Sequence, residues 1–139
     1  MKEFFNNIYY YTNNFYGVEL DNYLYQDVPA GYLHNGLALL VFSIITCAAF
    51  YYWKAPVRRQ RLWWLCFVGI NGLLNFIFGL RYTMTPLINN KIKAGSEWSY
   101  IDCFAFSFTS IFWSIVFFVA ISLCIKWWSP AKYVPFCKF

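Results

Sequence analysis

The sequence carries very little charge for its length. Only 12% of its 139 residues are charged, against about 25% in an ordinary soluble domain, whereas 60% are hydrophobic and the mean hydropathy is +0.43. Charge is wholly absent from three stretches, 33–53, 62–80 and 103–125. This composition excludes an ordinary soluble domain and predicts a chain that lies in a lipid bilayer.

Groups for catalysis are also scarce. The chain has one histidine, His34, and no Gly-rich phosphate loop, no H-E-x-x-H motif and no G-x-S-x-G motif. An intramembrane enzyme or proton-coupled transporter would be expected to carry ionisable groups inside its spans, but these stretches hold no Asp, Glu, Lys or Arg, and His34 lies at the entry of the first. We therefore expect that the protein is not an enzyme.

Metal and nucleic-acid sites have no signature either. The five cysteines include no C-x-x-C pair and no spacing typical of zinc ligands or of a disulfide framework, so no cofactor and no metal site is expected. The formal charge of +5 comes from cations that flank apolar stretches rather than from a basic face. Nucleic acid is therefore not an expected partner, and the lipid bilayer is.

The uncharged stretches have the length of membrane-spanning helices, which need about 20 apolar residues. The fold class predicted is an all-α integral membrane protein with three transmembrane helices at about 33–53, 62–80 and 103–125. Residues 81–102 are expected to form a loop and residues 126–139 a short, basic, aromatic tail. Together, residues 33–139 form the predicted transmembrane domain.

The first 32 residues are too polar to span a bilayer, but they show a helical pattern. Apolar side chains recur at spacings of four and three, opposite several asparagines. They are Phe4, Ile8, Tyr11, Phe15 and Val18. The pattern predicts an amphipathic helix that lies in the membrane interface within residues 1–32.

The distribution of charge predicts the orientation. Residues 54–61 hold four cations and no anion, which by the positive-inside rule makes this loop cytoplasmic. The N-terminal segment has a net charge of minus three and is then outside, residues 81–102 form an outer loop, and the C-terminus is cytoplasmic. The expected location is a bacterial inner membrane.

The second predicted span has a polar, thin side. Asn71 and Asn75 lie four residues apart on one helix face, and Gly72 and Gly79 lie on or beside it. In the third span a similar stripe of small hydroxyl residues consists of Ser107, Ser110 and Ser114. Two arrangements fit: the amides pair with this serine stripe inside one chain, or they face neighbouring copies or a water-filled axis in a ring.

Two functions follow from these arrangements. The first is a homo-oligomeric, channel- or pore-like assembly that alters membrane permeability, with a bacterial antiviral defence effector as one context. Arg81 would then lie at its outer mouth, and Phe67, Phe76 and Phe78 are candidates for an apolar gate. The alternative is a non-catalytic structural subunit of a larger membrane complex, whose partners are other membrane subunits.

Overall fold

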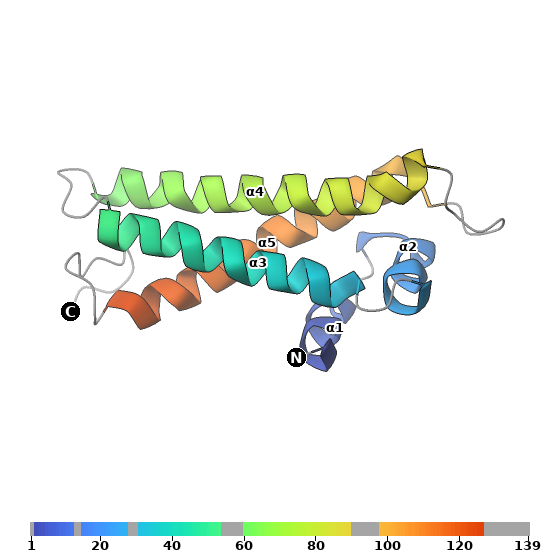
Figure 1. The fold of residues 1–139 in the computed structure, drawn as a ribbon, viewed down its shortest axis with the longest axis horizontal. Helices are drawn as coiled ribbons and strands as arrows, with labels where there is room; N and C mark the ends of the chain where they lie inside the picture. Colours follow the sequence, from blue (N-terminus) through green and yellow to red (C-terminus); the bar gives the residue numbers. More distant parts are fainter. Residues whose placement is uncertain (1, 13–14, 28–30, 54–59, 90–97, 127–139) are drawn as a thin grey trace.

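The computed structural model describes residues 2–12, 15–27, 31–53, 60–89 and 98–126, and every element in these ranges is a helix. Three of the helices are long and apolar enough to cross a bilayer: Gly31–Tyr52, Gln60–Ile88 and Tyr100–Ile125. They run along the long axis of the molecule, and the short N-terminal helices gather at one end (Figure 1). The prediction of an all-helical protein with three such helices is confirmed.

The described elements are five α-helices and two short π-helical turns. In chain order they are α1 (Lys2–Tyr10), α2 (Val18–Asn22), the π-helical turn η2 (Tyr23–Asp27), α3 (Gly31–Ala48), the π-helical turn η3 (Ala49–Trp53), α4 (Gln60–Ile88) and α5 (Tyr100–Lys126). α3 and α5 begin at the end of the bundle where α4 finishes (Figure 1). We call this end the Arg81 end and the opposite one the Arg61 end.

The predicted loop at 81–102 needs a correction at both of its ends. α4 continues past Arg81 to Ile88, and α5 begins at Tyr100, so much of this stretch is helical. Within the described residues only 89, 98 and 99 lie between the two helices, and residues 90–97 lie outside the description. Of the predicted cytoplasmic loop at 54–61, residues 60 and 61 belong to α4, and of the predicted tail at 126–139, residue 126 belongs to α5; the other residues of both lie outside the description.

The last turns of α4 contain a proline and two threonines whose hydroxyls bond the backbone of the preceding turn. The Pro86 ring has no N–H to donate to the turn before it. The Thr83 hydroxyl donates to the Gly79 carbonyl at 2.9 Å, and the Thr85 hydroxyl donates to the Arg81 carbonyl at 2.5 Å. These bonds are made at the carbonyls of Gly79 and Arg81, whereas the carbonyl that Pro86 leaves without its helical donor is that of Tyr82.

The N-terminal segment packs through residues other than the predicted stripe. Phe4, Tyr11, Phe15 and Val18 of that stripe are exposed and Ile8 is half-buried. Phe5 and Tyr9 are buried instead, and a Cβ atom on Gly36 of α3 would lie 2.2 Å from the Phe5 ring. The glycine therefore allows α1 to contact α3 closely. An interfacial position of α1 stays a prediction.

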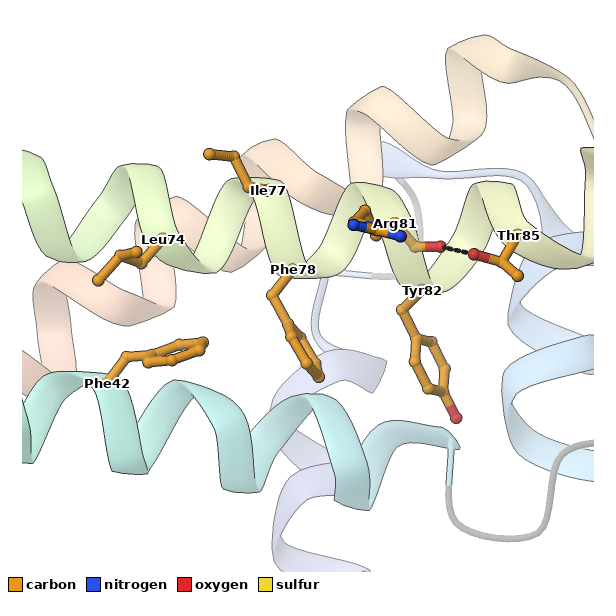
Figure 2. A pocket seen from close by; sticks show the side chains of 7 residues that line it. All are labelled: Phe42, Leu74, Ile77, Phe78, Arg81, Tyr82 and Thr85. Atoms are coloured by element: carbon orange, nitrogen blue, oxygen red, sulfur yellow. Dashed lines mark hydrogen bonds between the residues drawn. The ribbon is translucent and has the colours of Figure 1, made fainter.

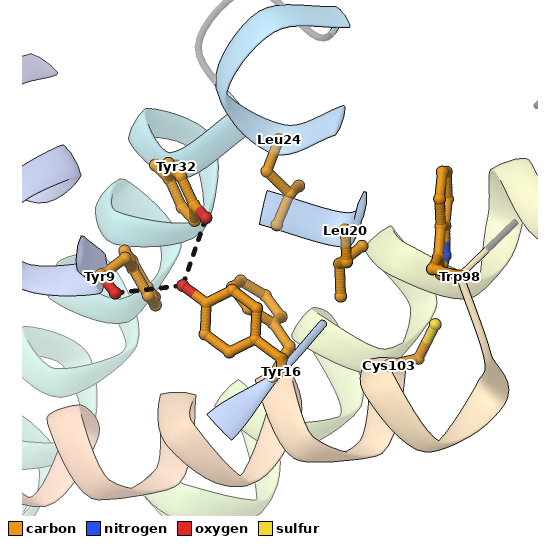
Figure 3. Packing of buried hydrophobic residues seen from close by; sticks show 8 residues of the cluster. Tyr9, Tyr16, Leu20, Leu24, Tyr32, Trp98 and Cys103 are labelled. Carbon is orange, nitrogen blue, oxygen red and sulfur yellow. Dashed lines mark hydrogen bonds between the residues drawn. The ribbon is translucent and has the colours of Figure 1, made fainter. Parts of the chain in front are cut away.

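An aromatic cluster joins the N-terminal segment to the Arg81 end (Figure 3). We call it the aromatic cap; its buried members are Tyr9, Tyr16, Leu20, Leu24, Tyr32, Trp98, Cys103 and Phe106. The Phe106 ring of α5 lies at its centre, with ring centroids 5.4 Å from Tyr9 and 5.2 Å from Tyr16. The cap thus connects α1, the start of α3 and the start of α5 through side chains.

Hydrogen bonds fix the tyrosines inside this cap. The Tyr16 hydroxyl donates to the Tyr9 carbonyl at 3.1 Å and lies 3.2 Å from the Tyr32 hydroxyl, which itself contacts Asp21. Burial raises the pKa of Tyr9 to about 12 and raises the pKa of Tyr16 above its usual range. These phenols are therefore held in the neutral form.

A single carboxylate holds the start of α5 and the N-terminal segment together. One oxygen of Asp102 accepts the backbone N–H of Ser99 at 2.9 Å, as the third residue of a capping box does. The other oxygen accepts the backbone N–H of Gly17 at 3.3 Å. A helix cap is thus also a contact across 85 residues of sequence.

Candidate functional site

The two amides of α4 lie inside the chain, between the three long helices. Asn71 is fully buried, and its Nδ2 donates to the Ser43 hydroxyl of α3 at 3.1 Å and to the Ser114 carbonyl of α5 at 3.1 Å. One side chain therefore connects α4 to both of its neighbours. We call Ser43, Asn71, Asn75 and Ser114 the amide seam.

Asn75 supports Asn71 from one turn further along α4. Its Nδ2 donates to the Asn71 backbone carbonyl at 2.9 Å and to the Asn71 side-chain oxygen at 3.2 Å. The side-chain oxygen of Asn71 therefore has a donor, and both Asn71 donor positions are used. A buried polar network with its groups satisfied holds helices in one arrangement.

The predicted glycines and serines lie where α4 meets α5. A Cβ atom on Gly79 would lie 3.5 Å from the hydroxyl oxygens of Ser107 and Ser110, and one on Gly72 would lie 3.3 Å from a methyl carbon of Ile111. Because Gly72 and Gly79 have no side chain, the serine stripe of α5 can approach α4 closely at these two positions.

The hydroxyls of the serine stripe do not accept hydrogen bonds from the two amides. Ser107 donates to the Cys103 carbonyl at 2.8 Å, Ser110 donates to the Phe106 carbonyl at 3.2 Å, and Ser114 donates to the Ile111 carbonyl at 2.7 Å. All three bonds stay within α5, and only the Ser114 backbone accepts from Asn71. The stripe contributes small size and self-satisfied hydroxyls rather than amide partners.

Ser43 is the member of the seam that the sequence did not single out. It lies in α3, and its only signal is a weak one: Gly36, Ser43 and Cys47 are small residues spaced by seven and four. These three residues are buried, so the spacing marks the inner face of α3. A lone serine among apolar residues is too common to indicate a hydrogen-bond partner by itself.

The three predicted gate residues pack on different neighbours. Phe67 lies 5.8 Å from the Phe50 ring, Phe76 lies 5.3 Å from the Phe108 ring of α5, and Phe78 lies 5.9 Å from the Phe42 ring of α3 (centroid distances). Phe76 lies on the opposite side of α4 from Phe67, since nine residues make two and a half turns. The three rings therefore do not converge within one chain.

Arg81, the predicted outer-mouth residue, is exposed on α4 beside an apolar groove of about 400 Å³. Figure 2 shows the rings of Phe42, Phe78 and Tyr82 in the space between α3 and α4, with Arg81 on the same stretch of α4. Leu74, Ile77 and Thr85 complete the lining. One end of the groove therefore carries the charge of Arg81, and the other end is apolar.

The seam contains amides, hydroxyls and carbonyls, but no group that titrates or ligates a metal. Among the described residues, no group of three or more His, Cys, Asp or Glu side chains could hold a metal ion. Comparison with protein-family models, with curated proteins and with solved structures finds no match to this chain.

Proposed function

We propose that this protein is a non-catalytic structural subunit of a larger membrane complex. The observation that carries the proposal is the amide seam, in which the amides of α4 are buried and bonded within one chain. The seam uses those polar groups to hold α3, α4 and α5 together. It leaves an apolar outer surface, and through that surface the chain would meet lipid and other membrane subunits.

A ridge on α5 is the surface that we assign to contact with a neighbouring subunit. Phe104, Phe108 and Phe112 recur every four residues and are exposed on one side of the helix. Beside them, Thr12 and Phe15 of the N-terminal segment border an apolar groove of about 410 Å³. Helices associate in lipid through close packing, so ridges and grooves of this kind favour a fitted partner helix.

The membrane orientation is part of the proposal. We place the aromatic cap and the N-terminus outside and the C-terminus in the cytoplasm of a bacterial inner membrane, with α1 in the interface. The charge distribution of the sequence supports this orientation. The exposed Phe4 and Tyr11 rings, which lie at the end of the bundle, support an interfacial contact for α1.

A second candidate is a homo-oligomeric assembly that alters membrane permeability, as a defence-type membrane effector would. Arg81 favours it, because this cation is exposed and has no ion pair among the described residues. Several copies would present a ring of such cations. Any water path would run between copies, since three helices with a filled interior do not enclose one.

Co-expression of two differently tagged copies, followed by purification through one tag, separates the two candidates. The structural-subunit proposal predicts that the second tag is not recovered and that the purified chain gives no ion flux in liposomes. In native membranes, the chain should then migrate in a larger particle that Phe108→Ala plus Phe112→Ala disperses. Leu73→Ala, an exposed change on α4, serves as the control.

Recovery of both tags together with ion flux would overturn the structural-subunit proposal and support the homo-oligomer. In that case Arg81→Ala should change the ion selectivity, because it removes the cationic ring. An unchanged reversal potential would remove Arg81 from the second candidate.

A further inference from the structure

The groove beside Arg81 has the shape and chemistry of a lipid site. On α4 its lining residues follow the helical repeat, with Leu74, Ile77, Phe78 and Arg81 among them, so they share one face. From Leu74 to Arg81 the face changes from apolar to cationic over about 10 Å. The order matches that of an acyl chain and its headgroup.

The depth of Arg81 in a bilayer follows from the length of α4. Arg61 and Arg81 are 20 residues apart, which in a helix corresponds to about 30 Å. That is the thickness of the hydrocarbon core, so both guanidinium groups lie at the level of the lipid phosphates. The apolar part of the groove then extends from Arg81 into the hydrocarbon.

The charge of Arg81 has no partner within the described part of the chain. Its backbone carbonyl accepts a hydrogen bond from the Thr85 hydroxyl (Figure 2). Its guanidinium forms no ion pair with another of the described residues. A guanidinium group binds phosphate oxygens through paired hydrogen bonds, and both Arg81 and Tyr82 line the groove. Charge complementarity therefore selects a phosphate.

We propose that this groove binds an anionic phospholipid, with one acyl chain along Phe42, Leu74 and Ile77 and the phosphate at Arg81. The site is separate from the α5 ridge, and the proposal does not depend on whether the chain is a structural subunit or a homo-oligomer.

Native mass spectrometry of the purified full chain, titrated with palmitoyl-oleoyl phosphatidylglycerol, tests the proposal. Arg81→Gln should weaken the tightest phosphatidylglycerol site about tenfold, because it removes a charge-assisted pair of hydrogen bonds. Arg81→Lys should lose less affinity than Arg81→Gln, since the charge remains although the paired hydrogen bonds do not. Arg61→Gln removes the matched cation at the other end of α4 and should change the affinity less than about twofold.

A second pair of variants tests the acyl-chain part of the groove. Ile77 and Ile70 are both 47% exposed on α4 and lie seven residues apart, but only Ile77 lines the groove. Ile77→Trp should fill the groove and weaken phosphatidylglycerol binding, whereas Ile70→Trp should not. Equal losses for Arg81→Gln and Arg61→Gln, or unchanged binding in Ile77→Trp with helix content retained by circular dichroism, would overturn the proposal.

Discussion

The amide seam and the aromatic cap both hold the helices of this protein together, but they use opposite means. The seam lies in the middle of the spans and consists of small polar groups joined by hydrogen bonds, with Asn71 at its centre. The cap lies at the Arg81 end and consists of large rings around Phe106. The means that each region uses corresponds to its surroundings, lipid around the seam and water near the cap.

The difference follows from what drives association in each place. Inside a bilayer, apolar side chains gain little by leaving lipid, so helices associate through close packing and hydrogen bonds. Near the membrane surface, rings that leave water gain free energy through burial. Replacing a seam residue should therefore cost hydrogen bonds, whereas replacing a cap residue should cost buried area.

The largest effect is expected at the centre of the cap. Phe106→Ala should lower the free energy of unfolding by about 3 kcal/mol, because it removes a fully buried ring and leaves a cavity between Tyr9 and Tyr16. Circular dichroism during titration with SDS in detergent micelles measures the change. The matched control is Phe108→Ala two residues along α5, where the ring is 63% exposed. Equal losses in both variants would contradict the cap as a packed unit.

A smaller loss is expected in the seam. Asn71→Leu should lower the free energy of unfolding by about 1–2 kcal/mol, because the hydrogen bonds to α3 and α5 disappear. Asn75→Leu should cost less, since Asn75 bonds only within α4. The same SDS titration compares the two variants. A larger loss for Asn75→Leu would show that the bonds between helices are not the main contribution.

The hydrogen bonds of Asp102, which join the start of α5 to the N-terminal segment, should contribute less to the stability than those of the seam. Asp102→Ala removes the acceptor for the Ser99 and Gly17 backbone N–H groups and should cost about 1 kcal/mol. Hydrogen exchange at residues 15–27 should increase, while exchange in the middle of α4 should not. Glu19→Ala, which removes an exposed carboxylate nearby in the sequence, serves as the control.

Alkaline pH should distinguish the regions without any mutation. The pKa of Tyr9 is about 12 in the folded protein, above the ordinary value of about 10. Because the pKa of Tyr9 is raised in the folded protein, the contribution of its neutral phenol to the stability is complete below about pH 10. This contribution is lost as the pH rises toward 12. The aromatic circular dichroism of the cap should decline in this window, and Tyr9→Phe should reduce the decline. The seam has no titrating side chain, so the helix signal should persist; simultaneous loss of both signals would contradict this expectation.

The sequence was sufficient to predict the three spans and the face that α4 turns to α5. Uncharged length identifies a membrane helix, and the spacing of Asn71, Gly72, Asn75 and Gly79 identifies its polar side. It was not sufficient to decide which residue the amides meet. That choice depends on the rotation and depth of α3, and the small-residue spacing around Ser43 is too weak a signal to give both.

The end of α4 and the buried face of α1 were not predicted from the sequence, and each has a physical reason. Arg81 and Pro86 are ordinary signals for the end of a helix, yet α4 continues to Ile88, and Leu87 in this last part packs against the cap. In the N-terminal segment, Phe4 and Phe5 begin two apolar faces that are one residue out of phase. Periodicity alone does not say which face meets the bundle, and the close approach at Gly36 selects Phe5.

A double-mutant cycle between Ser43→Ala and Asn71→Ala tests most directly whether the amides join the helices within one chain. The unfolding free energies of the unsubstituted protein, the two single variants and the double variant are measured by SDS titration. We predict a coupling free energy of about 1 kcal/mol, independent of protein concentration, because each change removes the same hydrogen bond. Additive losses, with a coupling near zero, would contradict the account.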